Sequence, residues 1–275
     1  MPVTRRNLIK SALLVLPGLV LADAFWFESN FVELNEFYIG SATKDTENIK
    51  VVQISDLHLH MINRPLIQLA DEINKLQPDL ILITGDAFDN AKDITLLNDF
   101  LLLIDKSIKK TAILGNWEYF SKVDFTELAK VYNEHNCMLL INQSIQYSLR
   151  NRTISITGVD DFLRGNPDIE TAMKEYVSSD HHIILVHCPE YCDYISERLN
   201  KDAKVDFILS GHTHGGQVNI FGFVPVLPKG CGRYVKGWYN ENTPKLYVSK
   251  GIGTNIFSPF RLGARAEIAL FHLAT

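Results

Sequence analysis

Five apolar segments of this sequence each end in a short polar motif, and this repeated pattern constrains the fold more than any other feature. The segments have the length and the β-branched content of buried strands. The motifs begin at Ser55, Gly85, Gly115, His187 and Gly211. The first three follow one another at intervals of 30 residues, which is long enough for a strand–helix–strand crossover. Because ligands of open α/β sheets gather at the carboxyl ends of strands, we expect the five motifs to converge in space.

The polar side chains of these motifs are oxygen and nitrogen donors that suit a metal ion. The candidate metal ligands are Asp56, His58, Asp86, Asn116, His187, His212 and His214. Carboxylate, amide and imidazole groups suit Mn, Fe or Zn, whereas a softer metal would require thiolates. Each motif alone has an ordinary interpretation, since a Gly-Asp pair is usually a turn. The complete set, with every member placed after a strand, predicts a metal site.

The segments between the motifs alternate between strand and helix patterns. Strands are expected over residues 31–39, 49–54, 79–84, 111–114, 138–141, 145–149, 153–157, 182–186 and 205–209. Helices are expected over residues 66–76, 93–107, 121–135, 168–179 and 189–200, and strands with long loops from Gln217 onward. This alternation predicts an α/β fold in which two packed sheets carry helices on their outer faces. The net charge of −5 gives the chain no overall basic footprint for a nucleic-acid backbone and argues against nucleic acid as a partner.

The N-terminus has the pattern of an export signal. Arg5 and Arg6 precede an apolar run over residues 12–21, and a run of about 10 residues is too short to span a bilayer. Ala22-Asp23-Ala24 then provides a small-x-small cleavage pattern. We expect residues 1–24 to be a twin-arginine-type signal peptide or an N-terminal anchor, and an ordinary secretory signal is the alternative. Residues 25–48 are expected to be an N-terminal strand and linker, and residues 49–275 the main domain.

The motifs resemble those of the calcineurin-like metallophosphoesterase superfamily. The residues that carry the resemblance are Asp56-x-His58, Gly85-Asp86-x-x-Asp89, Gly115-Asn116, His187 and Gly211-His212-x-His214. The run Gly-His-Thr-His-Gly-Gly-Gln over residues 211–217 looks like a bacterial branch of exported or membrane-attached members. The resemblance covers nearly all of residues 49–272. It implies that residues 49–275 form a metallophosphoesterase domain, a four-layer sandwich of two mixed β-sheets flanked by helices.

The resemblance also implies a dinuclear metal centre and a hydrolytic reaction. One divalent ion would be held by Asp56, His58, Asp86 and His214, and the other by Asp86, Asn116, His187 and His212. A hydroxide between the two ions would attack a phosphodiester or a pyrophosphate. Asp89 would order the loop beside the metals, or it is a solvated turn carboxylate. The twin-arginine machinery would carry the chain across the bacterial inner membrane into the periplasm or envelope, with attachment through the N-terminal segment as an alternative.

Trp117 departs from the family pattern, because most members carry histidine at this position. Indole is only a hydrogen-bond donor and does not titrate, and a missing general acid typically costs about 10²–10⁴ in rate. His60 and Glu118 are therefore candidate catalytic acids, although His60 also reads as a surface residue. Trp117 itself either stacks on the substrate or packs in the fold. The alternative function is a metal-binding protein whose catalysis is weak or lost.

The substrate is the least constrained part of the sequence analysis. An envelope lipid or a cell-wall phosphodiester is compatible with export. The apolar residues between Phe221 and Tyr239 predict either a groove for a lipid tail or ordinary packing. Candidate contacts for a phosphate are Arg233, Lys236, Arg261 and Arg265. Four cysteines, Cys137, Cys188, Cys192 and Cys231, leave room for one disulfide but do not make a disulfide scaffold.

Overall fold

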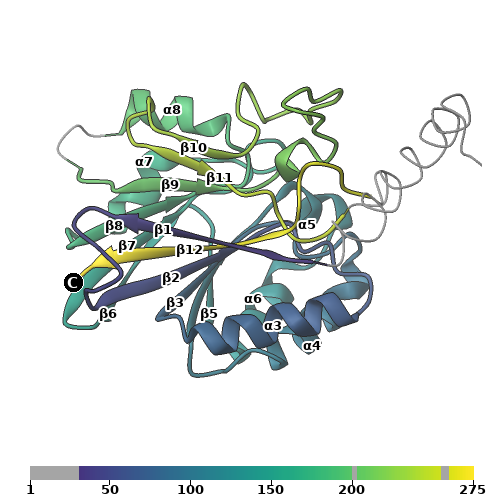
Figure 1. The fold of residues 1–275 in the computed structure, drawn as a ribbon, viewed down its shortest axis with the longest axis horizontal. Helices are drawn as coiled ribbons and strands as arrows, with labels where there is room; N and C mark the ends of the chain where they lie inside the picture. The colour runs from purple at the N-terminus through teal and green to yellow at the C-terminus, as the bar shows by residue number, and fades with distance from the viewer. Residues whose placement is uncertain (1–30, 200–202, 255–259) are drawn as a thin grey trace, which may run out of the picture.

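A computed structural model describes residues 31–199, 203–254 and 260–275 of the chain (Figure 1). The expected twin-arginine signal and the expected cleavage pattern lie outside these described residues. Within the described part, none of the helices has both the length and the apolar character needed to cross a membrane.

The strands form two mixed sheets of six strands each, which confirms the predicted sandwich. The first sheet has the order β1 (Glu33–Ile39), β12 (Glu267–Ala274), β2 (Asn48–Ile54), β3 (Leu80–Thr84), β4 (Lys109–Ile113) and β5 (Cys137–Leu140). The second has the order β10 (Gly237–Tyr239), β11 (Leu246–Val248), β9 (Phe207–Ser210), β8 (His181–Leu185), β7 (Arg152–Gly158) and β6 (Gln143–Leu149).

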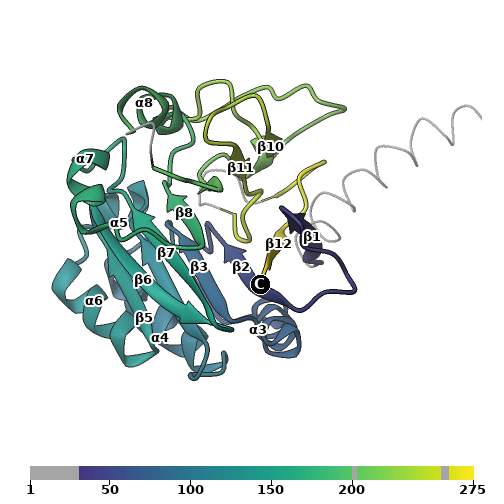
Figure 2. The same cartoon turned by 90° about the vertical axis from the view of Figure 1, so that its left-hand side faces the viewer.

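Helices cover the outer face of each sheet, which completes the four layers (Figure 2). The first sheet is covered by α3 (Arg64–Leu76), α4 (Ile94–Leu102) and α6 (Phe125–Glu134). The second is covered by α7 (Ile169–Ala172) and α8 (Tyr191–Arg198). In β2, Val51 packs between the two sheets while Val52 packs under the helices, because successive strand residues point to opposite faces. Both faces of the central strands are therefore buried.

Strand direction fixes which end of the sandwich carries the polar motifs. Strands β2, β3, β4 and β5 are parallel to one another, so their carboxyl ends share one edge. Strand β12 is antiparallel to β2, and β1 is parallel to β12. The start of β1 therefore lies at the same end of the sandwich as the carboxyl ends of β2 to β4. Because β1 pairs with β12, the strand expected within residues 25–48 is part of the first sheet.

The structure differs from the sequence expectations mainly in the helices. The helix expected over residues 121–135 corresponds to α6, which is preceded by a short helix that was not expected, α5 (Asn116–Ser121). Lys122 adopts a left-handed conformation that ends α5, and the Asp124 side chain caps the start of α6. The helix expected over residues 168–179 is only α7 followed by a 3-10 turn over Met173–Glu175. All four cysteines are buried and free, so the possible disulfide is absent.

Candidate functional site

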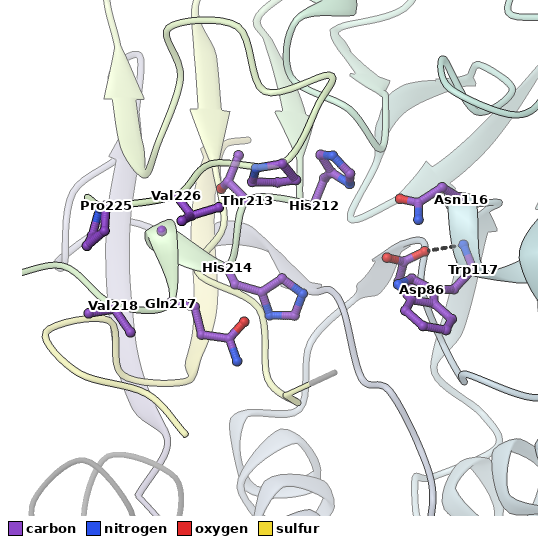
Figure 3. A pocket seen from close by; sticks show the side chains of 12 residues that line it. Asp86, Asn116, Trp117, His212, Thr213, His214, Gln217, Val218, Pro225 and Val226 are labelled. Carbon is purple, nitrogen blue, oxygen red and sulfur yellow. Dashed lines mark hydrogen bonds between the residues drawn. The ribbon is translucent and has the colours of Figure 1, made fainter. Parts of the chain in front are cut away.

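The seven candidate metal ligands meet at the carboxyl ends of the strands. Asp56 and His58 follow β2, Asp86 follows β3, Asn116 begins α5 after β4, and His187 follows β8. His212 and His214 follow β9. All but Asn116 are buried. Figure 3 shows Asp86 and Asn116 on one side of a cavity and His212 and His214 facing them from the other. The predicted convergence of the motifs is therefore observed.

The backbone at this site is strained. Five of the seven candidates have a positive φ, between 43° and 71°, namely Asp56, His58, Asp86, His212 and His214. Residues other than glycine rarely adopt this left-handed region, and each instance costs on the order of 1–3 kcal/mol. The rest of the fold must hold these turns in place. Such strain is typical of functional sites, where it aims side chains that a relaxed turn would point elsewhere.

Gly85 shows how closely two of the motif loops approach each other. It has a φ of +87°, and a Cβ atom at this position would lie 2.6 Å from His187 Nδ1 and 2.7 Å from the Gly115 nitrogen. No side chain fits there without moving the backbone. The glycine before Asp86 therefore lets the loops after β3, β4 and β8 meet.

The first group of donors consists of Asp56, His58 and His214, with Asp86 beside it. Their donor atoms lie close enough together to share one metal ion. His58 Nε2 lies 3.1 Å from His214 Nε2 and 3.8 Å from Asp86 Oδ2. His214 Nε2 is 3.7 Å from Asp56 Oδ1. The main-chain nitrogen of His212 donates to both Asp56 oxygens, at 3.0 and 3.1 Å, which fixes that carboxylate.

The second group consists of Asp86, Asn116, His187 and His212. His187 Nε2 is 3.2 Å from Asp86 Oδ2, 3.2 Å from Asn116 Oδ1 and 3.2 Å from His212 Nδ1. Asp86 Oδ2 therefore lies between the two groups, while Asp86 Oδ1 accepts a 2.9 Å hydrogen bond from the Trp117 main-chain nitrogen (Figure 3). This placement suits a carboxylate that contacts both groups at once.

Hydrogen bonds at the remote ring nitrogens fix the orientation of three histidines. His187 Nδ1 lies 2.8 Å from the Thr84 carbonyl oxygen, and His212 Nε2 lies 2.6 Å from the Lys229 carbonyl oxygen. His58 Nδ1 contacts the Asp89 carboxylate. Because these oxygens only accept, each remote nitrogen carries a proton, and in the neutral ring the opposite nitrogen presents its lone pair to the site. Metal-binding histidines are held in this way.

His214 is the exception, and its partner is Arg261. An Arg261 guanidinium nitrogen lies 3.2 Å from His214 Nδ1. Arginine only donates, so Nδ1 accepts and the ring proton lies on Nε2, which faces His58. An ion held by His214 Nε2 would displace that proton. Arg261 is fully buried and also donates to the carbonyl oxygens of Lys250, Gly253 and Ala264. We expected Arg261 to contact a substrate phosphate. This prediction is wrong, because its guanidinium group is committed inside the fold.

Buried opposite charges control the protonation of the site. Burial alone would raise the pKa of Asp86, but the facing His187 and His58 rings hold that pKa well below its ordinary value. Burial alone would lower the pKa of His187, but Asp86 and then Asp56 raise it well above its ordinary value. Burial lowers the pKa of His212 to about 4, and the adjacent His187 charge contributes. Burial alone would also lower the pKa of His58, but the Asp89 hydrogen bond and the Asp86 charge raise it. The Asp86 anion is thus strongly stabilised by the two histidines whose pKa values it raises.

The two candidate acids occupy different surroundings. Both Glu118 oxygens accept main-chain hydrogen bonds, from Asp86 at 3.1 Å, Ala87 at 2.7 Å and Gly115 at 2.7 Å. Burial and the nearby Asp86 charge raise the pKa of Glu118 to about 7. The acid role expected for Glu118 does not agree with this geometry. Its carboxylate accepts hydrogen bonds from main-chain amides of the loops beneath the site and does not line the cavity.

His60 lies apart from the cavity. It is exposed and lines a separate hollow with Met61 and Asn63, a hollow that shares only His58 with the seven candidates. This position agrees with the interpretation of His60 as a surface residue. Asp89, in contrast, is 3% exposed and contacts His58, so it is not a solvated turn carboxylate.

A cavity of about 540 Å³ opens next to the donors. One wall is formed by Asp86, Asn116 and Trp117 and another by His212 and His214 (Figure 3). The remaining lining is largely apolar and comes from the loop after β9, with Val218, Pro225, Val226 and Pro228. Trp117 is 8% exposed and packs edge-on against His58 and Phe120, at centroid distances of 5.7 and 5.0 Å. It therefore packs in the fold and also forms part of the cavity wall.

Sequence reasoning missed the groups that orient the histidines of the candidate metal site. Two of them are the carbonyl oxygens of Thr84 and Lys229, which no side-chain pattern reveals. The role of Arg261 beside His214 was also missed. The apolar stretch that we considered as one groove is divided, since Trp238 packs between the sheets against Phe37 and Tyr247, while Phe221 and Phe223 are exposed.

Comparisons with known proteins agree with this geometry. The family model for calcineurin-like phosphoesterases matches residues 49–216. The chain is 31% identical to the uncharacterized protein YpbG of Bacillus subtilis, over 82% of each chain. It is 29% identical to the uncharacterized metallophosphoesterase YkuE of the same organism, over 91% of this chain and 88% of that one. It is also 29% identical to the uncharacterized metallophosphoesterase YkoQ, over 82% of this chain and 83% of that one. The chain therefore belongs to the calcineurin-like phosphoesterase family.

Proposed function

We propose that this chain is a metal-dependent phosphohydrolase that cleaves a phosphodiester or a pyrophosphate. Two divalent ions, of Mn, Fe or Zn, would be held at the carboxyl ends of the strands. Asp56, His58, Asp86 and His214 would hold one ion, and Asp86, Asn116, His187 and His212 the other. The family match supports metal-dependent phosphoester chemistry, and the geometry supports this division of the residues.

The observation that carries the proposal is the pair His187 and His212. His187 Nε2 and His212 Nδ1 face each other at 3.2 Å, and the remote nitrogen of each ring donates to a carbonyl oxygen. Two neutral rings held in this way would point lone pairs at each other. A positive charge must lie between or beside them, either an extra proton on one ring or a metal ion. Asp86 and Asn116 supply oxygen donors at the same point, which suits a divalent cation.

The donor set also fits the chemistry of hydrolysis. When bound, two divalent cations lower the pKa of a water molecule and offset the charge that builds on phosphoryl oxygens during an in-line displacement. Asp86 is placed to contact both groups, and the Trp117 main-chain N–H fixes its second oxygen. Asp89 and the Thr84 and Lys229 carbonyl groups orient His58, His187 and His212 before any ligand arrives. This preorganisation removes the cost of arranging donors during the reaction.

The tryptophan at position 117 in the cavity wall favours substrates with good leaving groups. Trp117 occupies the position where a histidine would protonate the leaving oxygen, and an indole N–H does not titrate. Glu118 is committed to three main-chain amides, so it does not replace that acid. A leaving group that departs without protonation, such as an aryl oxide or a phosphate, loses least from this absence. We therefore favour pyrophosphates and activated diesters over simple alkyl phosphates.

We also propose that the chain acts outside the cytoplasm, in the periplasm or cell envelope. The paired arginines at positions 5 and 6 and the apolar run after them support export by the twin-arginine machinery. An envelope lipid or a cell-wall phosphodiester would be available as substrate there. The competing function is a metal-binding protein with little catalysis, which the loss of a histidine at position 117 would favour.

Turnover assays of the full chain separate these functions. Protein loaded with Mn, Fe or Zn is expected to hydrolyse bis-p-nitrophenyl phosphate, and to hydrolyse a simple alkyl diester far more slowly. The variant His187→Asn should lose turnover. The matched variant His272→Asn, which replaces a buried histidine on β12, should retain it. Loaded protein that binds metal but turns over no ester would favour the metal-binding function.

A further inference from the structure

We propose that the loop over residues 220–228, here called the rim loop, inserts its apolar tip into an anionic phospholipid bilayer. The end of the sandwich that carries the metal-site residues would then face the membrane. The rim loop joins the motif after β9 to the segment before β10. Four observations support this surface: the exposure of its apolar tip, its continuity with the cavity, the local charge, and the position of the N-terminal strand.

The rim loop presents its largest apolar side chains to solvent. Phe221 is fully exposed, and the exposed fractions of Phe223 and Val226 are 68% and 77%. A small hydrogen-bonded turn holds this tip outward. Ile220 and Phe223 exchange main-chain hydrogen bonds of 2.9 and 3.0 Å, and the Asn219 side chain accepts from the Gly222 nitrogen at 2.8 Å. The turn thus fixes two phenylalanines in water, which is unfavourable unless another apolar phase receives them.

The exposed tip is continuous with the cavity beside the donors. Val226 is exposed and also lines the cavity, together with Pro225 and Pro228 from the same loop (Figure 3). Val218, just before the loop, completes this wall. An amphipathic molecule could therefore place its polar phosphate near Asp86 while its apolar part follows the loop toward the tip. A surface that only stabilised the fold would not need an open apolar path of this kind.

The stretch of sequence that contains the rim loop has a charge opposite to that of the whole chain. The sequence carries a net charge of −5, yet residues 207–240 contain no aspartate or glutamate. The same stretch contains Lys229, Arg233 and Lys236, all of them exposed. Basic residues beside an apolar tip are the combination that binds anionic headgroups while apolar groups enter the acyl region. The charge pattern therefore favours an anionic bilayer.

The described chain begins at this same end of the molecule. The Asn219 nitrogen donates to the Leu262 carbonyl oxygen at 2.7 Å, and the Glu33 nitrogen donates to the Ala266 carbonyl oxygen at 2.8 Å. The chain from the Leu262 carbonyl group to the Ala266 carbonyl group is four residues long and spans at most about 14 Å. The start of β1 therefore lies near the base of the rim loop, at the right-hand end of the sandwich in Figure 1. The sequence that precedes β1 contains the apolar run of residues 12–21, so an N-terminal anchor formed by that segment would attach to the sandwich at this end.

A bilayer suits the tip better than a second copy of the chain does. A stable protein interface buries roughly 800 Å² on each partner, whereas the rim loop offers a narrow, protruding turn with a few large side chains. Such a tip can enter a fluid acyl region without a matching groove. One consequence concerns the substrate and rests on the proposed hydrolysis: it would be a phosphoester drawn from the bilayer. Docking itself does not depend on that chemistry.

Site-specific labelling of the full chain tests the insertion directly. The native cysteines are buried, so a polarity-sensitive fluorophore can be attached to Phe221→Cys. The matched control is Leu102→Cys, on α4, where the native side chain is 66% exposed. With vesicles of phosphatidylcholine and phosphatidylglycerol, the label at position 221 should shift to the blue and be quenched by nitroxide lipids. The label at position 102 should do neither. A label at 221 that stays in water on vesicle-bound protein would overturn the proposal, as would a shift that accompanies dimerisation without vesicles.

A second pair of variants tests the energetic contribution of the tip. Phe221→Ser/Phe223→Ser should weaken binding to the same vesicles by about tenfold or more, because two phenylalanines no longer enter the acyl region. Leu102→Ser/Val177→Ser, which removes two exposed apolar residues elsewhere, should leave binding unchanged. Equal vesicle affinity of both variants would overturn the proposal. Neither readout involves turnover, so a failure of the proposed hydrolysis would be seen separately with bis-p-nitrophenyl phosphate.

Discussion

Replacing Asp89 should weaken metal binding selectively at one of the two donor groups. The Asp89 carboxylate contacts His58 Nδ1, and these residues are 3% and 1% exposed. A buried hydrogen bond to a charged group contributes about 1.5–3 kcal/mol, and 1.4 kcal/mol corresponds to a factor of ten in affinity. In Asp89→Ala, the His58 proton is free to move to the nitrogen that should face the metal. The metal affinity of the Asp56, His58 and His214 group is therefore expected to fall by about 10–100-fold.

Competition with a chromogenic chelator measures both metal affinities of the full chain. The His187 and His212 group serves as an internal reference, because its orienting carbonyl groups are unaffected by the change. Asp89→Asn should lose less affinity, since the amide oxygen can still accept from His58. Asp99→Ala, at an exposed position on α4, should change neither affinity. The reasoning is refuted if Asp89→Ala binds both ions like the wild type, or if both affinities fall equally.

Three further changes test separate parts of the structure. Gly85→Ala should lower the free energy of unfolding by about 2–5 kcal/mol in urea titrations, because overpacking adds to left-handed strain. The control is Gly40→Ala, where φ is also positive but an added Cβ would meet no atom within 4 Å. An equally large loss of stability in Gly40→Ala would contradict the steric explanation. Trp117→His should accelerate hydrolysis of alkyl diesters by at least about tenfold and of aryl diesters little, and equal acceleration of both would contradict a leaving-group effect. Burial lowers the pKa of His182 to about 4, so the unfolded chain binds a proton at this residue before the folded chain does. The wild type should therefore lose up to about 3 kcal/mol of stability as pH falls from about 6.5 to 4. His182→Asn should lose less over this range, and identical pH profiles of the two proteins would refute the lowered pKa of His182.

The fold and the meeting of the motifs could be predicted because both follow from local patterns. Apolar strands followed by Asp56, Asp86 and Asn116 at a fixed interval place those residues on one sheet edge, whatever the loops do. The strand over residues 31–39 was also predicted from its sequence. Its pairing with β12 was not, because that contact joins residues more than 200 positions apart.

The orienting groups could not be predicted, because they depend on how the loops fold in three dimensions. Glu118 follows the metal motif in sequence, which suggested a catalytic role. Its carboxylate instead binds main-chain amides of two loops, and only Gly115 is a sequence neighbour. The start of α5 at Asn116 was missed for a related reason, since Gly115 at the cap position lacks the side chain that usually marks a helix start. Arg261 was a candidate contact for a substrate phosphate, and no local sequence pattern predicted its burial beside His214.

Anomalous scattering from crystals of the manganese-loaded full chain tests the central proposal most directly. Two peaks are expected, about 3.5–4 Å apart and on either side of Asp86. One should lie among Asp56, His58 and His214, and the other between His187 and His212. A single peak, or peaks that do not share Asp86, would contradict the dinuclear site.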